Sequence, residues 1–219
     1  MCIRDRSIGD YAFMNMTSLQ TMDLSSVSAD ASLGRSLFSG CSALENVTLP
    51  ANLTAIGQSW FQNCTALKEL EIPATVQEIG MNAFWNTGLE SLTIPEGVTT
   101  LNNVIRQCYD LKTLKLPSTL TALSLASCSS LESVDLPATL TTLGTFSGCS
   151  SLKEVVIPEG VTSLVYNAFT SCTALEAVYI PASVTKIGYG TGPVSYTHLD
   201  VYKRQLRFLT DRSYLQSGL

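Results

Sequence analysis

The stretch IGQSWFQNCTALKELEIPATVQE, from Ile56 to Glu78, is followed at once by IGMNAFWNTGLESLTIPEGVTT, from Ile79 to Thr100. Both begin with an apolar residue and glycine, and both place leucines, proline and threonine in the same order. The register runs on to about Gly188 and back to Ser7. Self-similarity with a period of about 20 to 23 residues predicts a repeat architecture.

Each unit contains the pattern L-x-x-[LVM]-x-[LI], mostly followed by proline, as in Leu67, Leu70, Ile72 and Pro73. Alternation of the last apolar pair predicts a strand with one buried face. Proline ends the strand because it lacks the N–H that a ladder needs and fixes its own φ. One unit cannot bury its apolar residues alone, so neighbouring units must stack, with each strand hydrogen-bonded to the next.

The full pattern [IL]-G-x-x-[AW]-F-x-x-C-x-x-L-x-x-[LV]-x-[IL]-P-x-x-[VL]-T resembles the BspA-type leucine-rich repeat, over residues 7–192. The resemblance implies a right-handed repeat solenoid, with a parallel β-strand ladder on the concave side and short helical turns and loops on the convex side. It also implies a bacterial cell-surface or secreted protein of the adhesion or host-interaction type. The convex arm is shortened over 101–108, 123–128 and 143–149, and we expect this to alter the convex turns and not the ladder.

Six of the seven cysteines fall three residues before the first leucine of a unit. They could form disulfides or hold a metal, or they could be small buried hydrophobic residues at a turn. The third interpretation is favoured because Thr87 and Met16 occupy the same phase in two units, which a ligand set would not tolerate. We therefore expect these thiols to be reduced and buried: Cys41, Cys64, Cys108, Cys128, Cys149 and Cys172.

The composition argues against several classes of function. Between residues 7 and 192 there are seven Lys or Arg against fifteen Asp or Glu, a net charge of −8, which disfavours nucleic acid as a partner. The repeats contain no histidine, so a Ser-His-Asp or Cys-His arrangement lacks its base, and there is no C-x-x-C pair for zinc. The sequence predicts no enzyme activity, no cofactor or metal, and no membrane span.

The two ends differ from the repeat. MCIRDR, residues 1–6, and PVSYTHLDVYKRQ, residues 193–205, are both encoded by one short DNA element read in two frames. That element resembles the transposon mosaic end used to prepare sequencing libraries. We expect both segments to be translated adapter and His198 to have no function. The array should then hold about eight units, truncated at both ends, with residues 206–219 disordered or chimeric.

The leading hypothesis is a module that binds a protein or a glycan, and the alternative is a spacer for an anchoring or enzymatic domain lost by truncation. In L-x-x-L-x-L the third and fifth positions point away from the core, so they form two columns on the concave face. Most are small and polar, as a solvated sheet face would be. The candidate ligand-binding residues among them are Glu69, Glu71, Thr93, Lys115, Asp135, Val156 and Tyr179.

Overall fold

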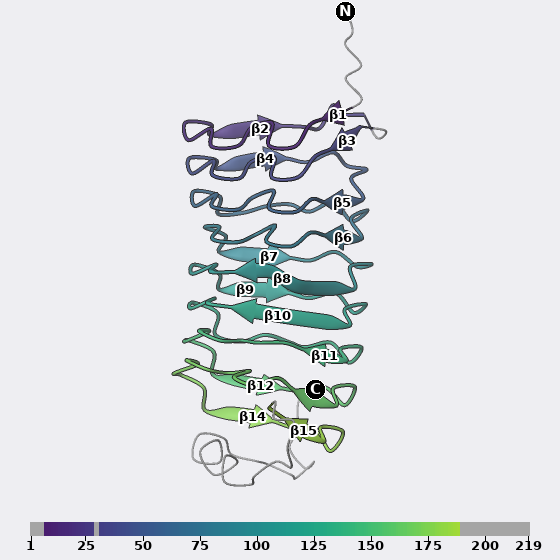
Figure 1. The fold of residues 1–219 in the computed structure, drawn as a ribbon, viewed down its shortest axis with the longest axis vertical. Coiled ribbons are helices and arrows are strands. Elements are labelled where there is room, and N and C mark those ends of the chain that lie inside the picture. The colour runs from purple at the N-terminus through teal and green to yellow at the C-terminus, as the bar shows by residue number, and fades with distance from the viewer. Residues whose placement is uncertain (1–6, 29–30, 189–219) are drawn as a thin grey trace, which may run out of the picture.

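Two ladders of short parallel strands run along a stack of coils in the computed structural model, which describes residues 7–28 and 31–188 (Figure 1). The predicted parallel-strand solenoid is confirmed. The adapter assignments at residues 1–6 and 193–205, and the expectation for 206–219, lie outside the described residues.

The leucine ladder is formed by the L-x-x-L-x-L segments. Its strands are β2 (Thr21–Asp23), β4 (Asn46–Thr48), β7 (Ser91–Thr93), β9 (Thr113–Lys115), β12 (Glu154–Val156) and β14 (Ala177–Tyr179). Equivalent motif positions lie opposite each other: Leu92 pairs with Leu114, and Val155 pairs with Val178. Residues that are equivalent in the sequence repeat are therefore also the residues that pair across neighbouring strands.

The second ladder is formed where an apolar residue precedes the glycine position of each unit. Its strands are β1 (Ser7–Ile8), β3 (Ser32–Leu33), β5 (Ala55–Ile56), β6 (Glu78–Ile79), β8 (Thr100–Arg106), β10 (Ala122–Ala126), β11 (Thr142–Leu143), β13 (Ser163–Leu164) and β15 (Lys186–Ile187). The last five of these form one continuous parallel sheet.

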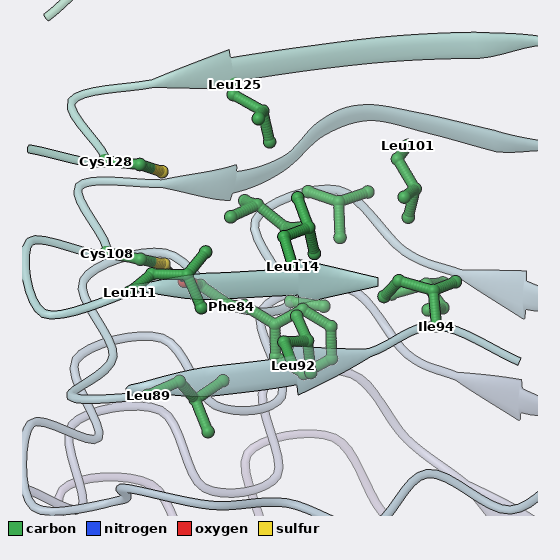
Figure 2. Close-up of a cluster of buried hydrophobic side chains, with 14 of the residues drawn as sticks. Phe84, Leu89, Leu92, Ile94, Leu101, Cys108, Leu111, Leu114, Leu125 and Cys128 are labelled. Carbon is green, nitrogen blue, oxygen red and sulfur yellow. Dashed lines mark hydrogen bonds between the residues drawn. The ribbon is translucent and has the colours of Figure 1, made fainter. Parts of the chain in front are cut away.

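The core lies between the two ladders and is continuous along the array. Figure 2 shows Leu89, Leu92 and Ile94 of one coil beside Leu111 and Leu114 of the next. All five are at most 7% exposed. Each coil thus buries its apolar face against its neighbours, as the repeat pattern predicts.

A row of aromatic rings crosses four successive coils within this core. Phe13, Phe38, Phe61 and Phe84 have ring centroids 5.6, 5.6 and 6.0 Å apart, with interplanar angles of 15° or less. In the next two coils Ile105 and Leu125 occupy the corresponding buried positions. The phenylalanine of the motif therefore stacks on itself in consecutive coils.

Short helical turns were expected on the far side from the leucine ladder, and this expectation is wrong: the described residues contain no helix. The I-G-x-x-A-F-x-x-C arm folds into tight turns with left-handed residues at two fixed positions. In one unit these are Ser59 (φ 56°) and Asn63 (φ 62°), and in the next Asn82 (φ 59°) and Asn86 (φ 54°). Positive φ at every fourth residue prevents a helical turn, and asparagine tolerates that conformation better than most residues.

The shortened arms change this side as expected. In two of the three shortened arms strands replace part of the turns, so β8 has seven residues and β10 has five, whereas β11 at the third arm has only two. Strands β8 and β10 pair with a register shift between Leu123 and Leu125. Only the left-handed residue before the cysteine is kept in the arm that ends at Cys128.

Hydroxyl side chains join the coils at the turns. The hydroxyl oxygen of Thr139 lies 2.7 Å from the backbone oxygens of both Ser118 and Leu120 and can donate its one hydrogen to either. Thr119 donates to the backbone oxygen of Val98 at 2.9 Å. These bonds satisfy carbonyls that no ladder reaches. The abundance of threonine near the motif's proline therefore has a structural cause.

The leucine ladder is interrupted, which corrects the expectation that every strand bonds to the next. Residues 69–71 and 133–135 stand at strand positions but form no strand pairing in the described part of the chain. Their outward-pointing side chains, at the third and fifth positions of the motif, are Glu69 and Glu71 in one segment and Ser133 and Asp135 in the other. Every other unit has threonine, valine or tyrosine at one of these two positions. β-branched and aromatic residues favour strands, and we attribute the two breaks to their absence at both outward positions.

Candidate binding face

The third and fifth positions of the L-x-x-L-x-L segments form an exposed surface, which we call the motif face. Every side chain in its two columns is exposed except Ala177 and Tyr179, which are partly buried. The residues between the columns are buried or partly buried; Leu92 is 2% exposed and Val155 is 1% exposed. The orientation predicted from period-two alternation is therefore confirmed.

The candidate residues fall into two groups on this face. Glu69, Glu71 and Thr93 border one hollow in the amino-terminal half. Val156 and Tyr179 are cross-strand partners on β12 and β14, at the carboxy-terminal end. The structure does not bring the two groups together, because four coils lie between that of Glu71 and that of Tyr179.

Two candidates lie between these groups. Lys115 is exposed on β9 and pairs in register with Thr93. Asp135 is exposed in the second unpaired segment, two coils from Tyr179. Neither has an ion pair within the described residues, so both present their charges to solvent.

The hollow lies between the unpaired segment and β7 and has a volume of about 530 Å³. Its lining consists of Glu69, Leu70, Glu71, Ile72, Ala74, Ser91, Thr93 and Pro95. These residues follow one another along two neighbouring chain segments, so the hollow is a groove that runs parallel to the strands. Within the described residues, no backbone hydrogen bond involves the amide or carbonyl of Glu69, Leu70 or Glu71.

A column of alternating charges borders the motif face and was missed by the sequence reasoning. It consists of the residues that directly follow the first leucine of six successive units: Lys68, Glu90, Lys112, Glu132, Lys153 and Glu176. Within it, Lys112 Nζ lies 2.8 Å from Glu90 Oε2, and Lys153 pairs with Glu132. The alternation is visible once the units are aligned, because stacking places equal phases next to each other.

These pairs shift the ionisation of their members in the expected sense. The hydrogen bond from Lys112 lowers the pKa of Glu90, and the same bond raises the pKa of Lys112. The bond from Lys153 likewise lowers the pKa of Glu132. Both side chains of each pair are at least 45% exposed, so the column adds little to stability and acts as a solvated charged border.

The in-phase cysteines are packing residues that also make hydrogen bonds. Five are buried, as predicted, but Cys172 is only partly buried because it lies near the end of the described array. The thiol of Cys108 donates to the backbone oxygen of Phe84 at 2.8 Å, and that of Cys64 donates to Phe38 at 3.2 Å. Four of the cysteines therefore tie their coil to the one before it: Cys41, Cys64, Cys108 and Cys172. Cys128 instead contacts the backbone oxygen of Ala126 in its own coil at 3.8 Å.

The thiols differ in their electrostatic environment: a hydrogen bond with Cys128 lowers the pKa of Cys108 and of Cys149, whereas Cys64 and Cys172 shift upward. Burial raises the pKa of Cys64 far above its ordinary value and that of Cys172 to about 11, so both stay protonated at neutral pH. A nucleophilic cysteine needs the opposite shift. The six thiols are free in the structure, and in Figure 2 the side chains of Cys108 and Cys128 lie parallel.

The described residues offer no group of three or more His, Cys, Asp or Glu side chains placed to hold a metal ion. Among the same residues, no helix is long and apolar enough to cross a bilayer.

The fold and its repeated motif define a leucine-rich repeat protein built as a parallel β-solenoid. The sequence model for the BspA type leucine rich repeat region, in six copies, matches residues 4–105 and 102–191. The chain belongs to this family. None of the curated proteins with which it was compared matches it in sequence.

Solved structures of bacterial leucine-rich repeat proteins have the same fold. A leucine-rich repeat protein from Bacteroides ovatus is 28% identical with a TM-score of 0.66, over 83% of this chain and 55% of that one. A leucine rich cell surface protein from Faecalibacterium prausnitzii is 25% identical with a TM-score of 0.51, over 88% and 71%. A leucine-rich repeat protein from Eubacterium ventriosum, 20% identical with a TM-score of 0.63, covers 97% and 65%. The chain thus spans about half the length of its Bacteroides ovatus relative.

Proposed function

We propose that this chain is a non-enzymatic binding module of a bacterial cell-surface or secreted protein, and that its motif face contacts a protein or glycan ligand in adhesion or host interaction. Family membership and the likeness to a protein described as a cell surface protein support the class and the location. The exposed side chains of the motif face support contact with a ligand.

One observation carries the proposal: an apolar residue and an aromatic residue lie side by side on the open face. Val156 is 48% exposed although it stands in a strand, and its cross-strand partner is Tyr179. An exposed valine next to a half-buried tyrosine is unfavourable in water and favourable against a partner. Tyrosine is also among the residues that most often anchor interfaces.

The test is the Tyr179→Ala variant, assayed on an array of purified glycans and glycoproteins. We expect it to fold as the parent does, because the ring lies outside the core, and to lose about tenfold or more in affinity for any ligand that the parent binds.

Tyr166→Ala is the matched control. Tyr166 is 65% exposed and lies outside the motif face, in the turn after β13 (Ser163–Leu164), so its removal should leave binding unchanged. Equal affinity of parent and Tyr179→Ala protein for every bound ligand would contradict the proposal. It would favour the alternative, in which the array is a spacer between other domains.

A further inference from the structure

We infer that the groove beside Glu69 and Glu71 binds an extended basic segment of a partner protein, with lysine or arginine at every second position. This rests on the proposed function, since it names the chemistry of one partner of the motif face. It concerns the amino-terminal half of that face, away from Tyr179, so the two sites can be tested separately.

The direction of the groove limits the shape of its occupant. Its walls are residues 69–74 on one side and 91–95 on the other, both running along the strand direction. A ligand that fills a groove of about 530 Å³ between two parallel segments lies along them. An extended peptide has this form.

The backbone of the groove supplies the hydrogen-bonding groups that such a peptide needs. In the leucine ladder of the described chain, the amides and carbonyls of Glu69, Leu70 and Glu71 have no backbone partner. In the next strand the corresponding groups of Leu92 and Thr93 pair with β9. One wall of the groove is therefore a chain segment between the coils of β4 and β7 whose amides and carbonyls have no backbone partner.

The side chains of the groove determine the charge of that peptide. Glu69 and Glu71 are exposed, project to the same side, and have no ion pair among the described residues. Two residues along a strand span about 6.6 Å, and lysines at alternate positions of an extended peptide have the same spacing. Ser91 and Thr93 on the opposite wall are small and uncharged, so they leave room for long side chains.

The experiment measures the affinity of two capped synthetic peptides for the whole chain. One alternates lysine and threonine, and the other has the same composition arranged as Lys-Lys-Thr-Thr repeats. Only the first places neighbouring lysines on one side of an extended backbone. We expect it to bind about three- to tenfold more tightly, with an affinity that falls as salt is added.

Glu69→Gln combined with Glu71→Gln should remove this preference and weaken binding of the alternating peptide about tenfold. Glu154→Gln is the matched control, because Glu154 is an exposed carboxylate in the same column as Glu69 and lies outside the groove. Equal affinity for the two peptides, or the same loss in the control, would overturn the inference and leave a non-specific acidic surface.

A steric variant tests whether the peptide occupies the groove itself, independently of the charges of Glu69 and Glu71. Ser91→Trp fills the groove and should block the alternating peptide. Ser133→Trp makes the same change in the same column but outside the groove, so it should leave binding of the alternating peptide unchanged. Peptide binding that survives Ser91→Trp would also overturn the inference. Because Tyr179→Ala leaves this groove intact, loss of the proposed function at that end does not alter the peptide result.

Discussion

At the scale of single residues, the motif positions have specific tasks that their residue types explain. The cysteine phase holds a small buried side chain that can donate to a nearby backbone carbonyl. Cys64 donates to Phe38 of the preceding coil, whereas Thr87, at the same phase of the next unit, donates to Phe84 of its own coil at 3.3 Å. Threonine at this phase therefore keeps a donor, although its bond stays within one coil.

This assignment predicts different outcomes for two substitutions of nearly equal shape. Cys64→Thr keeps a donor, whereas Cys64→Val removes it from a fully buried site. We expect the valine variant to be less stable than the threonine variant by about 1 kcal/mol, the net value of one buried hydrogen bond. Equilibrium unfolding in urea measures the difference. Equal stabilities would mean that the cysteine phase requires packing volume alone.

At the scale of elements, outward-pointing side chains decide whether a leucine segment pairs as a strand. The inward residues are apolar in every unit, yet residues 69–71 and 133–135 remain unpaired. The property that distinguishes these two units is the lack of any β-branched or aromatic residue at the outward positions. Side-chain packing on the exposed face thus contributes to ladder formation.

The second break offers the cleaner test, because no groove is assigned to it. Ser133→Thr combined with Asp135→Val should extend the ladder through this unit and raise the unfolding free energy by about 0.5 to 1 kcal/mol. Amide hydrogen exchange at Val134 and Leu136 should slow. Lys115→Val, in the already paired β9, is the control and should leave exchange there unchanged. Unaltered exchange at Val134 would show that another feature causes the break.

At the scale of the whole molecule, the close stacking of coils determines where the motif glycine is needed for stability. The same glycine is essential in an inner coil and dispensable in the first described coil. A Cβ on Gly80 would lie 2.5 Å from the backbone nitrogen of Gln58 in the preceding coil. A Cβ on Gly9, at the same phase of the first described coil, would meet nothing within 4 Å. At Gly80 it is therefore the neighbouring coil that leaves no room for a side chain. At Gly188, the same phase of the last described coil, φ is +81° and the backbone itself favours glycine.

Gly80→Ala should accordingly destabilise the array by about 1 to 3 kcal/mol, the usual cost of overpacking. Gly9→Ala should change stability by no more than about 0.5 kcal/mol. Thermal and urea unfolding of the two variants against the parent provide the comparison. A similar loss for both would indicate that glycine is needed for local conformation, and would contradict the stacking argument.

Much of the architecture follows from the sequence alone, because each unit repeats the same apolar spacing and one unit cannot bury it. Leu67, Leu70 and Ile72 already indicate a strand, its buried face and its end at Pro73. The outward direction of Glu69, Thr93 and Tyr179 also follows from alternation. These are local properties, and stacking identical units preserves them.

Other features depend on contacts between coils, which no single unit contains. Left-handed residues at two phases replace the expected helical turns, since each turn bonds to the coil beside it: Phe61 donates to the backbone oxygen of Ala83 at 2.9 Å. The breaks in the leucine ladder and the groove between Glu71 and Thr93 depend on how neighbouring segments separate. The sequence determined the repeated unit and which side of it meets solvent. Only the tertiary structure decided where adjacent coils hydrogen-bond and where a groove remains between them. The reason is that the distance between two coils depends on the side chains of both, and no single unit contains it.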